Sequence, residues 1–330
     1  MKIKAFREEG QTSVFRMIIK AIMEMRELVV LLVVILMCIF MALNSEQFMT
    51  MANVKIIGNY MATDMIMGSF LTIALIAGLK DFSIGSNMGC SAFVCGLMLN
   101  AGYDIAPSIL CGLLTGIVIG AINAFIVVKL HLLPMIATLG TQMAFKGAGL
   151  MIINSTTLSN FPMEFKAIVQ EWKLFGMSTL IVVMIVIVLI TAFLLKYTSF
   201  FHQAYFIGSN PDSARLSGIN VSKFYFIIYM IVGASAALAG ILSISRYGSA
   251  PASLGQGVEF RVVSGLLIGG VSMSGGEGSI LGAFLGILLM ALIANALTLF
   301  GIDSNLQNVL IGSIMIISVA IDEANRRRQK

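Results

Sequence analysis

The chain has 330 residues, of which 58% are hydrophobic and 11% are charged, and its formal net charge is +5. Soluble domains carry about 25% charged residues, and the mean hydropathy here is +0.96. This composition excludes an ordinary soluble enzyme and a disordered chain. It indicates a membrane protein that crosses the bilayer several times.

The first 27 residues carry six positive charges and precede an apolar run. We interpret residues 28–44 as a retained first span, because the run is long for a signal peptide and further spans follow. Apolar residues alternate with Arg16, Lys20 and Arg26 at helical spacing. Residues 1–27 are therefore predicted to be a basic amphipathic segment on the cytoplasmic surface. A plain extension of the first span is the alternative.

Long uncharged runs then recur along the chain, the longest being the 25 residues 278–302. A helix needs about 20 apolar residues to cross the hydrocarbon core. The fold predicted is all-α and polytopic, with about ten spans and no strand-like alternation. The predicted spans are 28–44, 56–79, 84–101, 105–128, 134–153, 177–196, 223–246, 261–273, 279–300 and 306–322.

The basic residues are distributed unevenly between the predicted loops. Of the 21 Lys and Arg residues, 15 lie in the pieces assigned to the inner side and five in the outer pieces. This bias places both termini in the cytoplasm. An even number of spans follows, and eight or ten would both satisfy it. Residues 28–322 form the predicted transmembrane domain, and residues 323–330 are predicted to form a basic cytoplasmic tail.

The longest outer loop, residues 154–176, combines Phe161, Trp172 and Phe175 with charges of both signs. This pattern fits a short interfacial helix, and it fits equally well a docking surface for an external partner.

The longest inner loop, residues 196–223, carries a helix-start signal at Asn210-Pro211-Asp212 and a stop at Gly218. A short surface helix is predicted over residues 211–217, although an ordinary connecting loop is the alternative. Such a helix could engage a soluble motor. The candidate coupling residues are Asn210, Pro211, Asp212, Ala214, Arg215 and Gly218.

The sequence contains 32 glycines, and we predict two structural roles for them. Gly112, Gly116 and Gly120 share one helix face, which favours close helix packing. Residues 265–278 are instead predicted to be broken or kinked backbone packed in protein near the inner half of the membrane. This break would let the spans on either side move separately. Its glycines are Gly269, Gly270, Gly275, Gly276 and Gly278.

Polar uncharged residues occur inside several spans, where unpaired amides are costly. Each could join neighbouring helices. As a group they could also line a path for an uncharged, hydroxyl-rich solute, because charge rings typical of ion channels are missing. The candidates for such a path are Asn59, Asn87, Asn123 and Asn295.

The sequence contains no phosphate-binding loop, no HExxH and no nucleophile elbow. Its four cysteines and two histidines lack metal-ligand spacing. We therefore predict no catalytic residue, no metal and no cofactor on this chain, and no enzymatic activity. If transport uses ATP, another chain must hydrolyse it.

Four motifs give the chain a resemblance to a known family. Residues 81–86 read DFSIGS, residues 133–140 read LPMIATLG, residues 214–221 read ARLSGINV and residues 269–278 read GGVSMSGGEG. In this order they resemble the membrane permease subunits of ribose-type ABC importers, which also serve galactose, xylose, allose and the furanosyl autoinducer. The resemblance extends over residues 28–322.

The resemblance implies several partners and a location. These are a cytosolic ABC ATPase that binds ATP and Mg, an external sugar-binding protein, a second permease copy in a homodimer or heterodimer, and the lipid of a bacterial inner membrane. No nucleic acid is implied.

Three positions depart from the family pattern. Leu79-Lys80 replaces an apolar residue and glycine, and Arg261 replaces the aspartate of an E-x-D-A segment in which Glu259 is kept. These departures concern the identity of the sugar. A stand-alone secondary transporter or facilitator of a small polar solute is the alternative function, and inverted repeats would favour it.

Overall fold

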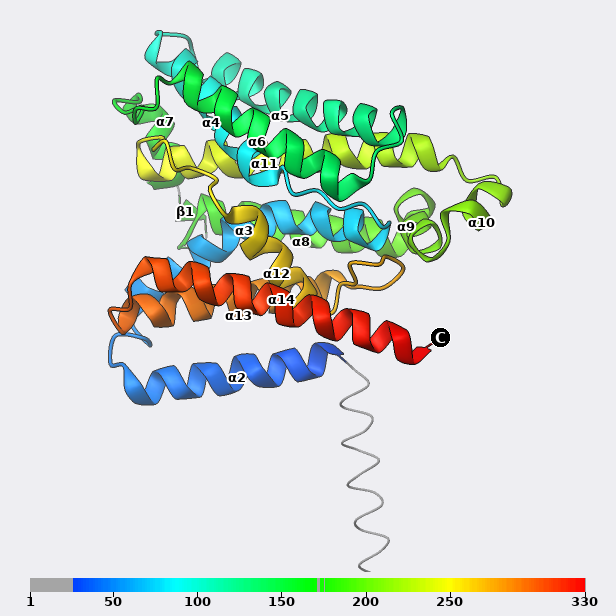
Figure 1. Ribbon diagram of the computed structural model, residues 1–330. Coiled ribbons are helices and arrows are strands. Elements are labelled where there is room, and N and C mark those ends of the chain that lie inside the picture. The colour runs from blue at the N-terminus through cyan, green and yellow to red at the C-terminus, as the bar shows by residue number, and fades with distance from the viewer. Residues whose placement is uncertain (1–25, 171–172, 175, 330) are drawn as a thin grey trace, which may run out of the picture.

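The computed structural model describes residues 26–329 except 171, 172 and 175. The predicted amphipathic segment 1–27 therefore lies almost wholly outside the described residues, and so does Trp172. The described chain is a bundle of helices whose long axes run roughly parallel (Figure 1). Its helices are α2 (Arg26–Asn44), α3 (Met51–Ile76), α4 (Ile84–Asn100), α5 (Ile105–Val128), α6 (Pro134–Ile152), α7 (Met163–Gln170), α8 (Thr179–Tyr197), α9 (Ser199–Ser209), α10 (Pro211–Leu216), α11 (Val221–Tyr247), α12 (Val258–Ile268), α13 (Ile280–Leu299) and α14 (Ser304–Gln329).

Each of the ten predicted spans falls on one of these helices, and the all-α class is confirmed. Six described helices are long and apolar enough to cross a membrane, namely α2, α3, α5, α8, α11 and α13. The count of ten crossings stays a prediction. At 11 residues, α12 is only about 16 Å long, roughly half of the hydrocarbon thickness. The predicted tail 323–330 is largely a continuation of α14, which extends to Gln329.

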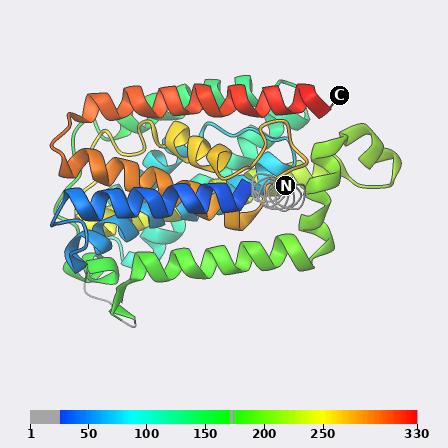
Figure 2. The ribbon, with the colours of Figure 1, turned by 90° about the horizontal axis from the view of Figure 1, so that it is seen from below.

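The two ends of the bundle differ. The start of α2 and the end of α14 lie at the same end as α9 and α10, whereas α7 lies at the opposite end (Figures 1 and 2). This agrees with an even number of crossings. Beside α7, the two-residue strands β1 (Lys173–Leu174) and β2 (Met177–Ser178) pair antiparallel.

Capping side chains fix several helix starts. Thr50 accepts a hydrogen bond from the backbone N–H of Asn53 at the start of α3, and Asn220 does the same for Lys223 in α11. Ser279 caps α13 through the N–H of Gly282. Such side chains satisfy backbone donors that have no partner within the helix.

Glycine faces hold the interior together. A side chain at Gly116 in α5 would strike the Gly233 carbonyl and the Ala237 side chain of α11. Likewise Gly286 in α13 packs on the Gly265 carbonyl of α12. The predicted role of the Gly112–Gly116–Gly120 face in close packing is confirmed at Gly116, and Gly286 has the same role between α12 and α13.

The outer segment before α8 forms the short helix α7. Phe165 and Val169 of α7 are buried, as is Phe161 just before it. The rings of Phe161 and Phe165 meet edge to face with centroids 5.9 Å apart. The segment is therefore anchored to the bundle by its aromatic residues. A docking surface for an external partner, the second interpretation of this segment, stays a prediction.

Candidate functional site

The helix α10 projects from one end of the bundle on the elbow that it forms with α9 (Figure 1). The side chain of Asn210 accepts hydrogen bonds from the N–H groups of Asp212 and Ser213, both at 3.0 Å. Pro211 occupies the first turn, and Gly218 ends the segment with φ +85°. The start signal in the sequence thus produces a short, rigid helix.

The two faces of α10 have different surroundings. Ala214 is buried against α9, whereas Leu216 is 91% exposed. An ion pair of 2.9 Å joins Arg215 to Asp212 on the exposed side. Of the predicted coupling residues, Ala214 is therefore the buried one. The large apolar side chain that faces outward is Leu216, which the sequence analysis did not single out.

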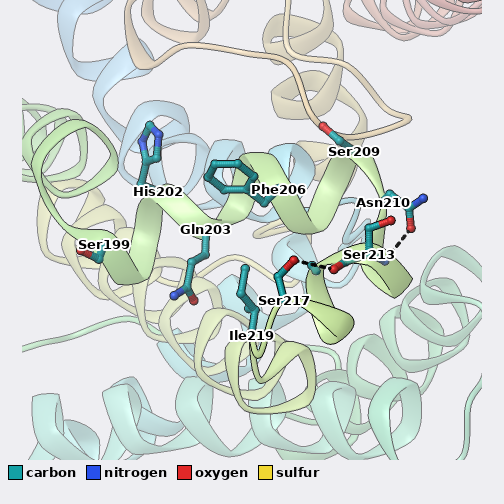
Figure 3. A pocket seen from close by; sticks show the side chains of 10 residues that line it. Ser199, His202, Gln203, Phe206, Ser209, Asn210, Ser213, Ser217 and Ile219 are labelled. Atoms are coloured by element: carbon teal, nitrogen blue, oxygen red, sulfur yellow. Dashed lines mark hydrogen bonds between the residues drawn. The ribbon is translucent and has the colours of Figure 1, made fainter.

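A cleft of about 580 Å³ lies between α9 and α10 (Figure 3). Serine, asparagine and glutamine side chains alternate with apolar ones around it. The lining residues are Ser199, His202, Gln203, Phe206, Ser209, Asn210, Ser213, Ala214, Ser217 and Ile219.

The elbow is joined directly to the glycine-rich segment. Between α12 and α13 the backbone of residues 269–279 leaves the helical conformation. The N–H of Gly276 donates to the carbonyl of Ile76 at the end of α3, at 2.7 Å. The Tyr205 hydroxyl of α9 donates to the Gly278 carbonyl at 2.9 Å. Gly208 packs against both Ile76 and Gly276, with no room for a side chain. Three segments distant in sequence therefore meet without intervening side chains.

Two carboxylates hold the same loop from other helices. Asp322 of α14 accepts hydrogen bonds from the Ser272 hydroxyl and the Met273 N–H, at 3.1 and 3.2 Å. Glu27 of α2 accepts one from the Ser279 hydroxyl at 2.9 Å. The loop is thus bonded to α2, α3, α9 and α14. A displacement of the loop would consequently move or break its contacts with all four helices.

Two helices begin in the middle of the bundle. Residues 77–83 run from the end of α3 back into the bundle before α4 starts, and residues 248–257 do so from the opposite end before α12 starts (Figure 1). Their backbones touch where Gly85 meets Gly255. The carboxylate of Glu259 in α12 also lies against Gly85. Two helix N-termini thus converge at membrane depth, in backbone that is surrounded by protein.

Buried polar groups secure this meeting point. Asp81 accepts hydrogen bonds from the N–H and hydroxyl of Ser83, at 2.8 and 2.7 Å. Asn123 donates to the Ser83 hydroxyl at 2.7 Å and accepts from Thr141 at 2.7 Å. Gln142 donates to Oε1 of Glu259 at 2.5 Å. The Oε2 atom of Glu259 is buried and has no hydrogen-bond partner among the described residues.

The other three candidate path amides also have protein partners. Asn87 bridges α4 to the Gly116 carbonyl of α5 at 3.1 Å. Asn295 and Asn53 exchange two hydrogen bonds, at 2.7 and 3.1 Å, between α13 and α3. Asn59 accepts from Ser178. These contacts favour the alternative interpretation, in which amides join helices. A role in a solute path stays a prediction.

The sequence analysis singled out Arg261 as a departure from the family pattern but did not predict its ion pair with Asp64. Arg261 of α12 donates through Nε and Nη2 to the two carboxylate oxygens of Asp64 in α3, at 2.6 and 2.8 Å. Its guanidinium carbon lies 4.7 Å from the ring centroid of Tyr60. Arg261, which departs from the family pattern, is therefore paired with Asp64, a carboxylate within a predicted span.

Comparison with known proteins shows the class of this molecule. The family model described as a branched-chain amino acid transport system permease component matches residues 56–319. The chain belongs to this family. It is a multi-pass permease of the inner membrane, and the resemblance to ABC importer permeases is confirmed.

Curated relatives cover nearly the full length. The autoinducer 2 import system permease protein LsrC of Escherichia coli (strain SMS-3-5 / SECEC) is 29% identical over 94% of this chain and 93% of its own. The D-allose transport system permease protein AlsC of Escherichia coli (strain K12) is 32% identical over 87% of this chain and 88% of its own. No solved structure matches the chain.

Proposed function

We propose that this chain is the membrane subunit of an ATP-driven importer that takes up a monosaccharide delivered by an external binding protein. Two relatives are named for autoinducer 2 and D-allose, both small oxygen-rich solutes. Ribose, which the sequence resemblance brought forward, is one candidate among such sugars. The chain itself supplies the path, and ATP hydrolysis takes place on a separate ATPase.

The observation that carries this proposal is the elbow of α9 and α10. A helix that projects from the bundle can enter a cleft of an ATPase and move with it. Leu216 at its tip is exposed in the isolated chain, and burial of an exposed leucine in an apolar pocket of a partner would be favourable. This end of the bundle would then be the cytoplasmic one.

The route from the elbow to the path is short. Closure of the ATPase would move α10 and α9 as one body. Because Tyr205 and Gly208 of α9 contact Gly278, Gly276 and Ile76, the movement would reach the glycine-rich loop and the end of α3. From Ile76 the residues 77–83 lead to the start of α4. ATPase closure could therefore open or close the path where the starts of α4 and α12 meet.

The proposal is tested by reconstituting the chain with its ATPase and binding protein in proteoliposomes. We expect uptake of radiolabelled D-allose or D-ribose that requires ATP and the loaded binding protein. Uptake by the chain alone, at the same rate without ATPase, would instead identify a facilitator. A thermal-shift screen of the binding protein against pentoses and hexoses would identify the solute.

The elbow is tested separately by Leu216→Glu. We expect this variant to insert normally but to lose most of the ATPase stimulation by loaded binding protein, with Leu216→Met as the matched control. Ala214→Glu should abolish stimulation as well, because its charge would be forced between α10 and α9. Wild-type stimulation in Leu216→Glu would exclude docking through this tip.

A further inference from the structure

The ion pair of Arg261 and Asp64 lies deep in the bundle. Asp64 is near the middle of the 26-residue helix α3, about 20 Å from its start at 1.5 Å per residue. Arg261 is in the first turn of α12, which begins in the interior (Figure 1). A charge at this depth faces other protein groups or a water-filled cavity, because lipid contact is too costly.

The two members of the pair differ in exposure. The Asp64 side chain is 3% exposed and the Arg261 side chain 16%. The carboxylate is therefore enclosed, while part of the Arg261 side chain reaches the surface of the chain. Phe260, the preceding residue, is 37% exposed. Two consecutive residues of α12, an aromatic one and a guanidinium one, are thus both partly exposed at membrane depth.

The orientation of Arg261 is fixed on two sides. Asp64 accepts from two of its five N–H groups, and the Tyr60 ring lies against the guanidinium plane. Tyr60 and Asp64 are four residues apart on α3 and share one face. A held guanidinium loses little freedom when its remaining N–H groups form new hydrogen bonds.

Stability alone does not explain such a pair. Buried ion pairs can be replaced by apolar residues of similar volume at little or no cost in stability. The pair also cancels its own charge. An unpaired guanidinium would hold an anion firmly, whereas this one offers N–H donors with no net charge behind them, which suits the oxygens of an uncharged solute.

From this geometry we propose that Arg261, held by Asp64 and Tyr60, contacts the solute at the middle of its path and donates hydrogen bonds to hydroxyl or ring oxygens of a sugar. Phe260 beside it offers an apolar surface to the sugar's C–H face. The inference rests on the proposed function, because it names a residue that would discriminate between sugars in that same path. Asp64 and Tyr60 are positioning residues.

The first test exchanges the two charges in the complete importer with its ATPase and binding protein. The double variant Asp64→Arg with Arg261→Asp keeps an ion pair between α3 and α12 but moves the donors. We expect ATPase stimulation by loaded binding protein to persist. Sugar delivered per ATP should fall about fivefold, the effect of one lost hydrogen bond, and unequally for D-allose and D-ribose. Unchanged delivery of both sugars would overturn the proposal.

A second test decides the matter even if the exchanged variant fails to assemble. In a chain whose native cysteines are replaced, Arg261→Cys is combined with Asp64→Asn, and membrane vesicles are treated with a positively charged methanethiosulfonate. We expect labelling at position 261 and none in the control Leu189→Cys, whose position on α8 is apolar and 64% exposed. Equal lack of labelling at both positions would overturn the proposal.

A wrong solute and a wrong role for Arg261 would give different experimental results. If the wild-type importer moves neither sugar, the proposed solute is wrong, whatever the variants do. Labelling at position 261 needs no sugar, so it still reports whether the guanidinium edge meets water. If the wild type transports sugar and position 261 stays unlabelled, only the role of Arg261 is wrong.

Discussion

The helices at the rim of the bundle and those at its centre are built in opposite ways. On α2 and α8, leucine, isoleucine and valine face outward along nearly the whole length, and few residues are buried. Most of α3 is buried, yet it carries Asp64, and the neighbouring α12 carries Glu259 and Arg261. The central helices α3 and α12 therefore carry buried charges that the rim helices lack along their apolar faces.

This difference between rim and central helices follows from the lipid that surrounds the protein. Lipid is as apolar as leucine, so there is no hydrophobic force that drives one membrane helix onto another. Rim helices need only apolar surface. Central helices associate through close backbone contact and through hydrogen bonds, as at Gly286 on Gly265 and at Asn53 with Asn295. Substitutions should accordingly be costly at the centre and nearly free at the rim.

The largest effect is expected at the glycine-rich loop. Gly276 has φ +80°, and a side chain there would meet Ser209. Gly276→Val forces a β-branched residue into the left-handed region and separates the loop from α9. We expect uptake to fall at least about 100-fold, a loss of roughly 3 kcal/mol. Met273→Leu in the same loop should transport normally, and equal rates for both would show that the loop carries no movement.

The second effect tests the buried charge pair. Asp64→Ala leaves the guanidinium of Arg261 without its partner, and such a loss destabilises by about 3–5 kcal/mol. The double variant Asp64→Leu with Arg261→Met should recover most of this stability, although not transport. Thermal unfolding in detergent micelles measures both. Additive losses in the double variant would contradict direct coupling of the two side chains.

A smaller loss is expected where α4 meets α12. Gly85→Ala places a methyl group against the Glu259 carboxylate and the Gly255 carbonyl. Overpacking of this kind costs about 1–3 kcal/mol. The same change at Gly312 in α14, which has no other atom within 4 Å of an added Cβ, should leave the unfolding temperature unchanged or raise it, because alanine favours the helix. If the two variants are equally stable, the two helix starts are not in close contact.

The smallest change in stability is expected for a substitution at the rim of the bundle. Leu189→Ile on α8 alters one exposed apolar side chain, and we expect a change within about 0.5 kcal/mol. Uptake should match the wild type. A loss comparable to that of Gly85→Ala would show that this face of α8 packs against protein instead of lipid.

Much of the architecture could be predicted from the sequence. Uncharged runs located the long helices, because burial in lipid acts on every residue of a span. The helix start at Asn210-Pro211 and the glycine-rich break also follow from local chemistry, since capping and chain-breaking depend on neighbouring residues. The break was predicted from residue 265, whereas α12 continues to Ile268. The four candidate path amides show what could not be predicted from the sequence. A polar residue in a span must have a partner, but the sequence does not tell whether that partner is a helix or a solute.

The sequence by itself therefore determined where the long apolar helices lie and that their environment is lipid, although α9 (Ser199–Ser209), within the predicted inner loop, was not predicted. Only the tertiary structure decided which side chains meet. Asp64 and Arg261 lie 197 positions apart, and their pairing depends on the rotation and depth of α3 and α12. The same holds for α10, where packing against α9 turned Ala214 inward and Leu216 outward. Hydropathy reports the average surroundings of one helix, whereas the partner of a given side chain is set by how two helices pack.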